Sequence, residues 1–160
     1  MLCAMVTELN PPIRGAGRRI AIVAARFTAD VVEMMVDHTV ATLESHGVAS
    51  DDITLTWVPG SYELPLVCDG YARRADCDGV IALGCVIRGE TTHYDYVCEA
   101  ATEGILRTNL QHHCPVIFGV LTTDNRAQAL ARADGSKGDK GTDCATAALQ
   151  MIDILEALHE

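Results

Sequence analysis

One stretch of the sequence carries residue types that could bind an anion and move a proton. Residues 86–97 read VIRGETTHYDYV and continue the apolar run GVIALGC. A glycine beside a helix start lets backbone N–H groups face a ligand, and the helix dipole favours an anion there, which fits Gly89, Glu90 and Thr91. His93 falls in the first helical turn, and histidine suits proton transfer near neutral pH. Alone, the stretch is equally consistent with a threonine-capped helix start that binds nothing.

The elements that must position these residues alternate between strand and helix patterns. Apolar, β-branched runs that predict parallel strands covered on both faces occupy 19–25, 53–58, 79–87 and 115–122. Helical patterns occupy 28–46, 61–75, 92–112, 125–133 and 142–158. This order predicts an α/β fold, a three-layer sandwich around a four-stranded parallel sheet. Thr28 is the expected N-cap of the first helix, which is expected to end before Gly47.

The chain is expected to form a single domain preceded by an extended segment. Residues 19–160 are the predicted domain, a usual length for one hydrophobic core. Residues 1–18 contain two prolines and two glycines and read as an N-terminal arm. A four-stranded sheet is small, so the arm is expected to add an edge strand, on its own subunit or on a neighbour.

Further candidate residues follow the other predicted strands, where open parallel sheets bind ligands. Phe27 follows the first strand and Tyr62 the second, in a chain with only 4% aromatic residues, so a flat ring could stack there. Residues 131–144 hold Arg132 and the only two lysines, Lys137 and Lys140, which indicates a bound anion such as phosphate. Packing roles for the aromatics and a solvated polar loop remain open alternatives.

Composition and missing motifs exclude several classes of function. The net charge is −10 with twelve basic residues, so nucleic acid and anionic membranes are not expected partners. No apolar run approaches the ~20 residues of a membrane span, and no secretory signal is visible. Seven cysteines without a C-x-x-C pair predict reduced thiols in a cytoplasmic protein. No P-loop, dinucleotide fingerprint or metal-ligand spacing occurs, so no metal is expected.

Five motifs, in order from about Arg19 to the C-terminus, resemble the 6,7-dimethyl-8-ribityllumazine synthase family. They are VAARF, WVPGSYELP, ALGCVIRGETTHYDYV, PVIFGVLTT and ARADGSKGDKGTDCA. The resemblance implies a flavodoxin-like fold and a transferase for the penultimate step of riboflavin biosynthesis. That enzyme condenses 5-amino-6-(D-ribitylamino)uracil with 3,4-dihydroxy-2-butanone 4-phosphate to 6,7-dimethyl-8-ribityllumazine, releases phosphate, and needs no metal or redox cofactor.

The resemblance also implies a role for each candidate residue. Those implied to contact the ribitylaminouracil are Phe27, Ser61, Tyr62, Glu63, Cys85, Val86, Ile87 and, from an adjacent subunit, Phe118. Those implied to bind the phosphorylated substrate are Glu90, Thr91 and Arg132. His93 is implied to transfer the proton. Lys140 and Asp143 match positions near the site, and Asp143 is expected to orient or charge His93. Arg88 is left as a structural or interface residue.

The resemblance further implies a homo-oligomer. The family assembles as pentamers, some of which form decamers or icosahedral capsids of sixty subunits, and the compact 133–141 loop favours the capsid. Association with riboflavin synthase is also implied. Two other interpretations remain. A non-catalytic flavin-binding or storage protein on the same fold would require neither His93 nor Arg132. A cage that encloses cargo is compatible with catalysis. A receiver domain is disfavoured, because ARFTAD offers only Asp30 where an acidic cluster is needed.

Overall fold

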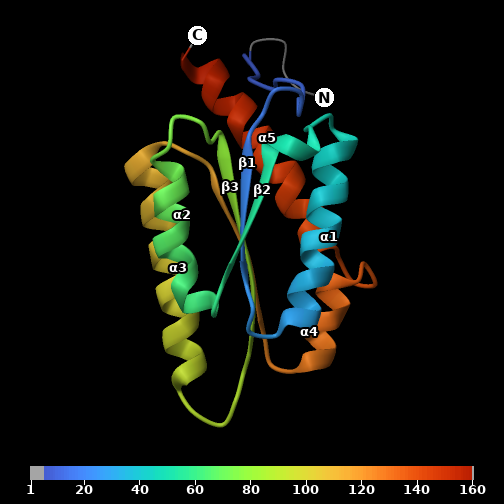
Figure 1. Ribbon diagram of the computed structural model, residues 1–160, viewed down its shortest axis with the longest axis vertical. Helices are drawn as coiled ribbons and strands as arrows, with labels where there is room; N and C mark the ends of the chain where they lie inside the picture. Colours follow the sequence, from blue (N-terminus) through green and yellow to red (C-terminus); the bar gives the residue numbers. More distant parts are fainter. Residues whose placement is uncertain (1–5, 160) are drawn as a thin grey trace.

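The structure, a computed structural model that describes residues 6–159, is a three-layer α/β sandwich around a parallel sheet (Figure 1). The strands are β1 (Ile20–Ala25), β2 (Ile53–Val58), β3 (Gly79–Ile87) and β4 (Val116–Thr123), in the spatial order β2-β1-β3-β4. One face is covered by α2 (Leu64–Ala72) and α3 (His93–His112). The other is covered by α1 (Ala29–Ser45), α4 (Arg126–Ala133) and α5 (Lys140–His159). The predicted fold class is confirmed.

Two hydrophobic cores form because the inner strands are apolar on both faces. In β1, Ile20 and Ile22 pack in the core beneath α1 and α5, whereas Ala21 and Val23 pack in the core beneath α2 and α3. Side chains of a strand alternate between its two faces, so a continuous apolar run serves both layers. No residue of β1 is exposed, whereas the edge strand β2 is only partly covered.

The predicted element boundaries agree closely with the structure, with three local differences. Thr28 occupies the N-cap position of α1 in a left-handed conformation and makes no capping hydrogen bond; its hydroxyl instead donates to the Cys85 carbonyl oxygen at 3.4 Å. The predicted helix at 61–75 is a 3₁₀ turn, η2 (Ser61–Glu63), followed by α2. A short 3₁₀ turn, η1 (Ser50–Asp52), was not predicted.

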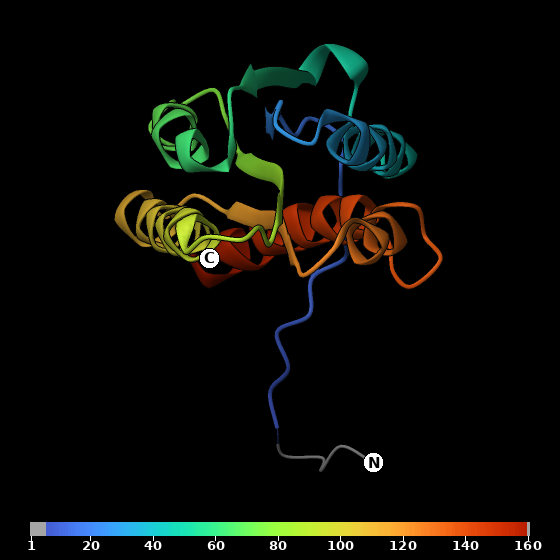
Figure 2. The ribbon, with the colours of Figure 1, turned by 90° about the horizontal axis from the view of Figure 1, so that it is seen from below.

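The described part of the N-terminal arm, residues 6–18, extends away from the body of the molecule (Figure 2). Within the described residues 6–18 it contains no strand, so the expected edge strand is not formed on its own chain there. Pairing with a neighbouring subunit stays a prediction, and residues 1–5 lie outside the described part of the chain.

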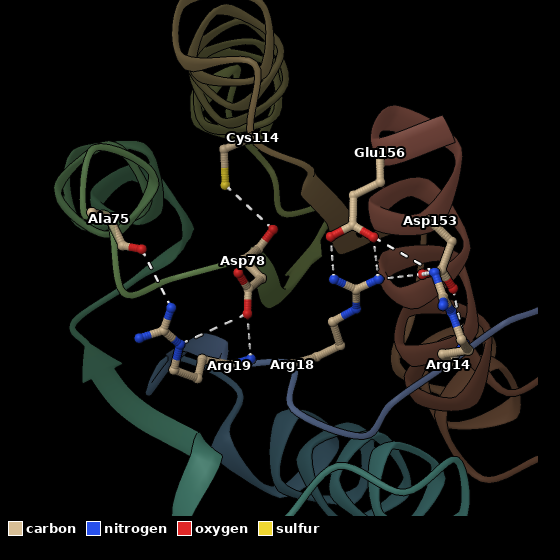
Figure 3. A network of polar contacts seen from close by, with 8 residues as sticks. All are labelled: Arg14, Arg18, Arg19, Ala75, Asp78, Cys114, Asp153 and Glu156. Atoms are coloured by element: carbon tan, nitrogen blue, oxygen red, sulfur yellow. Dashed lines mark hydrogen bonds and ion pairs between the residues drawn. The ribbon is translucent and has the colours of Figure 1, made fainter. Parts of the chain in front are cut away.

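The root of the arm is held by ionic contacts to the end of α5 (Figure 3). The Arg14 backbone N–H donates to Asp153 Oδ2 at 2.8 Å, and the Arg18 guanidinium pairs with both Asp153 and Glu156. The Asp153 carboxylate is fully buried. We call these four residues the arm latch. They fix the direction in which the arm leaves the domain.

Candidate functional site

A cavity of about 670 Å³ lies at the carboxyl edge of the sheet. It is lined by residues that follow β1 and β2, by the last residues of β3 and the loop after it, and by the first turns of α3. Of the residues predicted from the sequence, it brings together Phe27, Ser61, Tyr62, Glu63, Cys85, Val86, Ile87, Thr91 and His93. We call it the rim cavity. It is open and mostly apolar, as expected for a small-molecule site.

The aromatic side of the rim cavity is set by two tight turns. The Phe27 backbone N–H donates to the Pro59 carbonyl oxygen at 3.0 Å, which joins the turn after β1 to the turn after β2. The left-handed Thr28 then directs the chain into α1. As a result Phe27 is 75% exposed on the cavity wall, and Tyr62 is similarly exposed. Neither ring is a core packing residue.

One of the two turns also rests on the single tryptophan of the chain. The Arg26 guanidinium carbon lies 5.4 Å from the ring centroid of Trp57, a cation–π distance. The Arg26 backbone N–H donates to the Val58 carbonyl oxygen at 2.8 Å. These contacts stabilise the turn immediately before Phe27.

Gly84 in β3 allows η2, the turn after β2, to pack closely against the sheet. A Cβ atom at Gly84 would collide with Ser61 Oγ and lie 3.2 Å from Leu64 Cδ1. The absence of a side chain therefore makes room for buried Ser61, and the adjacent Tyr62 and Glu63 reach the cavity.

The β3 backbone is free on one side where it forms the cavity floor. Pairing between β1 and β3 ends at Ala24 and Leu83, whereas β4 continues alongside β3 as far as Ile87. Backbone groups of residues 85–87 that face β1 therefore have no strand partner there. Burial raises the pKa of the Cys85 thiol to about 11, so this cysteine is a neutral wall residue rather than a nucleophile.

The end of the cavity that contains His93 lies at the start of α3. His93 is the first residue of this helix of 20 residues, and Thr91 and Gly89 line the cavity beside it. The His93 backbone N–H points to Thr91 Oγ1 at 3.4 Å. The positive end of the helix dipole faces this position, which favours a bound anion.

Two lining residues on α3, Tyr94 and Val97, were missed in the sequence. Val97 follows His93 by four residues, so helical periodicity alone places it on the same face. Tyr94 stacks against Arg88, whose guanidinium carbon lies 4.2 Å from the ring centroid. The hydrogen bond to Asp124 raises the pKa of Arg88. Arg88 thus bridges the ends of β3, β4 and α3, in keeping with a structural role.

The remaining predicted residues do not join the rim cavity. Phe118, Arg132 and Lys140 line a second cavity of about 890 Å³ between β4, α4 and the start of α5, which we call the α4 cavity. Glu90 and Asp143 are exposed and line neither cavity. Among residues 6–159, no ion pair joins His93 to Asp143 or to another carboxylate.

Two kinds of feature are absent from the described residues. No cluster of three or more His, Cys, Asp or Glu side chains that could hold a metal ion occurs in residues 6–159. No helix in that part of the chain is long and apolar enough to cross a membrane. The six cysteines within it are free thiols, four of them buried.

The fold and the rim cavity are those of an α/β protein with a cavity of small-molecule size at the carboxyl edge of a parallel sheet, beside a histidine at a helix N-terminus. The family model for 6,7-dimethyl-8-ribityllumazine synthase matches residues 17–156. The chain therefore belongs to the 6,7-dimethyl-8-ribityllumazine synthase family, transferases of riboflavin biosynthesis.

Individual relatives support the same assignment. The 6,7-dimethyl-8-ribityllumazine synthase of Pediococcus pentosaceus is 44% identical over 153 residues, which cover 96% of this chain and 98% of the relative. That of Lactiplantibacillus plantarum is 44% identical over 153 residues, 96% of each chain. That of Salinibacter ruber is 44% identical over 155 residues, 97% of this chain and 99% of the relative.

Proposed function

We propose that this chain condenses 5-amino-6-(D-ribitylamino)uracil with 3,4-dihydroxy-2-butanone 4-phosphate, releasing 6,7-dimethyl-8-ribityllumazine and inorganic phosphate. The observation that carries the proposal is the rim cavity, which brings exposed aromatic rings, free backbone groups and His93 to one place. Family membership supports the same reaction.

The pyrimidine substrate fits the floor and aromatic wall of the rim cavity. Phe27 and Tyr62 can stack on a flat heteroaromatic ring. Backbone groups of residues 85–87 have no β1 strand partner, although the Cys85 carbonyl oxygen accepts from the Thr28 hydroxyl, and they can bond the polar edge of the ring. Glu63 can accept hydrogen bonds from the ribityl hydroxyls. Together these groups would hold the reacting amine in one orientation.

His93 is placed to serve the proton steps. The substrate amine attacks the carbonyl, the adduct loses water to an imine, and phosphate is then eliminated. A phosphate at the start of α3 favours the protonated imidazole, which can act first as an acid and then as a base. Cys85 stays neutral and does not compete as a nucleophile.

A complete site needs a second copy of the chain. Phe118 and Arg132 line the α4 cavity together, so an interface that supplies Phe118 to the rim cavity of a neighbour also supplies Arg132. Arg132 would hold the substrate phosphate bidentately, with Lys140 nearby. Leu66 and Leu110 on α2 and α3 are 79% and 68% exposed, which supports burial by another subunit.

The assembly that we propose is a pentamer, with the capsid of sixty subunits as its larger form and with riboflavin synthase as a further partner. We also propose a cytoplasmic location, which the free thiols support. Light scattering on the purified chain measures the assembly size directly. A monomer at micromolar concentration would contradict the shared site.

The reaction itself is tested by mixing both substrates with the purified chain. We expect lumazine absorbance and free phosphate to rise together in equal amounts. Binding of the pyrimidine with neither product formed would instead indicate the flavin-binding alternative.

The shared site is tested by combining two inactive variants. His93→Ala damages one half of the site and Arg132→Ala the other, so each homogeneous assembly is expected to be impaired. Dissociated, mixed in equal amounts and reassembled, they should recover about a quarter of the wild-type rate, since random pairing leaves that share of interfaces intact. No recovery would show that both residues act within one subunit.

A further inference from the structure

The loop at 134–139 connects the two basic residues that we assign to phosphate. Arg132 precedes the loop at the end of α4, and Lys140 follows it as the first residue of α5. The Arg132 Nη1 donates to the Lys137 carbonyl oxygen at 2.8 Å, and Gly135 and Gly138 both have positive φ. The directions of both cations therefore depend on the shape of this loop.

One side chain of α1 contacts the end of this loop. His38 Nδ1 lies 3.0 Å from Asp139 Oδ2. The nitrogen is shielded from solvent and, within residues 6–159, has no other polar partner; the contact is an ion pair whose angle departs from that of a straight hydrogen bond. Because a shielded polar atom needs a partner, we expect Asp139 to be important for holding the His38 ring in place.

Asp139 also caps the helix that begins with Lys140. Its carboxylate accepts from the Thr142 backbone N–H at 3.1 Å and from the Thr142 hydroxyl at 2.8 Å. Burial opposes ionisation of Asp139, but these hydrogen bonds and His38 outweigh it, so the pKa of Asp139 lies below its usual value. The charged carboxylate thus joins α1 to the first turn of α5.

Neutral contacts also join α1 to the first turn of α5. The Thr39 hydroxyl donates to the Gly141 carbonyl oxygen at 3.1 Å, and the Thr42 and Thr142 hydroxyls lie 3.2 Å apart. A Cβ atom at Gly141 would collide with the Met35 carbonyl oxygen. The helices are therefore in close contact, and the contact between His38 and Asp139 adds an ionisable pair to these neutral ones.

We propose that His38 is a positioning residue for the phosphate-binding end of the site. Its imidazolium pairs with Asp139 and holds the 134–139 loop so that Arg132 and Lys140 face the substrate phosphate. This inference rests on the proposed function, which assigns the phosphate to Arg132.

Three acidic residues lie close to His38 in space or along the chain. Asp139 faces it from the start of α5, and Asp134, at the end of α4, is near enough for His38 to help lower the pKa of that carboxyl, to which hydrogen bonds from Ser136 contribute most. Asp37 is its chain neighbour on α1. The His38 and Asp139 side chains are 38% and 29% exposed, so solvent screens the pair and its effect is moderate.

The test compares His38→Asn, Asp139→Asn and the double variant in the full chain and its native assembly. Asparagine places a neutral nitrogen near the position of Nδ1, and the Asp139→Asn variant keeps an oxygen that can cap α5. At pH 6 we expect each single variant to raise KM for the phosphorylated substrate about two- to fivefold, the range of a screened ion pair. The double variant should cost no more than either single one.

Three features separate this role from a merely structural one. KM for the pyrimidine and kcat should stay unchanged, and the difference between wild type and His38→Asn should nearly vanish at pH 8.5, where histidine is ordinarily neutral. His46→Asn is the control, because His46 lies at the end of the same helix and its Nδ1 meets the Thr42 carbonyl oxygen at 2.9 Å instead of a carboxylate. Additive single effects, or an equal rise in both KM values, would overturn the proposal.

A second measurement keeps this inference separate from the proposed function. Calorimetry with inorganic phosphate should give a Kd at pH 6 that is about two- to fivefold weaker for His38→Asn than for wild type. If the wild type forms no lumazine, the proposed reaction is wrong. The phosphate titration would still test whether His38 positions the phosphate-binding residues. Equal affinities in the two proteins, or no phosphate binding by the wild type, would refute the positioning role.

Discussion

His93 stands at the first position of α3 and makes no ion pair with a carboxylate in the described part of its own chain. The expectation that Asp143 orients the imidazole therefore has no support within one subunit. The positive end of the α3 dipole lies beside His93, where it favours a bound anion.

Replacing His93 by alanine tests this role. We expect kcat to fall about a hundredfold or more, the usual loss for a general acid–base, with both substrate KM values changed little. Steady-state and single-turnover rates measure the effect. His159→Ala, at the exposed end of α5, is the matched control and should behave as wild type. An unchanged single-turnover rate in His93→Ala would remove the assignment.

Arg132 is expected to act on binding of one substrate only. Arg132→Ala should raise KM for the phosphorylated substrate by about tenfold or more, because a charge-assisted hydrogen bond is lost, and should leave KM for the pyrimidine nearly unchanged. Arg126→Ala is the control on the same helix, since Arg126 pairs with Asp30 and lines neither cavity. Equal changes in both KM values would count against the phosphate role.

Part of the rim cavity could be predicted from the sequence, because several of its residues lie in segments that follow strands. That rule pointed to Phe27, Tyr62 and His93 as candidates, and the family resemblance supplied their expected roles. The sequence did not show that Phe118 and Arg132 line a separate cavity, because position along the chain does not reveal on which side of β4 a side chain lies. The same limit applies to His38 and Asp139, which meet across distant parts of the sequence.

At the scale of elements, hydrophobic periodicity predicted every strand to within a residue or two, because buried parallel strands are apolar throughout. It did not predict the spatial order β2-β1-β3-β4, which depends on how the crossover helices pack. It also missed the split of the second helix into η2 and α2. Composition does not reveal that split, because it arises where Ser61 packs against Gly84.

Gly84 provides a test of how the elements position the site. Gly84→Ala should push η2 off the sheet, lower the free energy of unfolding by about 1–3 kcal/mol as an overpacked core position, and raise KM for the pyrimidine. Denaturant unfolding and steady-state kinetics measure the two effects.

The control for this element is Gly70→Ala on α2, where an added Cβ meets no atom within 4 Å. It should raise the free energy of unfolding by about 0.5–1 kcal/mol through helix propensity and leave KM unaltered. If Gly84→Ala retained the wild-type KM for the pyrimidine, the close approach of η2 to β3 would not matter for binding.

At the scale of the whole molecule, the arm latch determines where the N-terminal arm can reach. The buried Asp153 carboxylate is compensated by Arg18 and by the Arg14 backbone N–H, so removing its charge leaves Arg18 only the more exposed Glu156. The hydrogen bond from Arg18 lowers the pKa of Glu156. That contribution to stability is present above the ordinary carboxyl pKa and is lost as the pH falls below it.

Asp153→Asn should loosen the arm without dismantling the domain. We expect trypsin to cleave after Arg14 and Arg18 about tenfold faster at neutral pH, because local opening exposes these bonds more often. Mass spectrometry of timed digests locates the cuts. Glu103→Gln, which breaks an exposed pair with Arg107 on α3, should leave the digestion rate unchanged. An unaltered rate in Asp153→Asn would mean that other contacts hold the arm.

The contact between Arg26 and Trp57 has a practical consequence for all of these experiments. Trp57 is the only tryptophan in the chain, and the cation on its ring belongs to Arg26, the residue before Phe27 on the wall of the rim cavity. Occupancy of that wall by a pyrimidine should alter the distance between guanidinium and indole, and therefore the intensity of indole emission. The protein carries an intrinsic fluorescent reporter of its own binding equilibrium, readable without label or turnover.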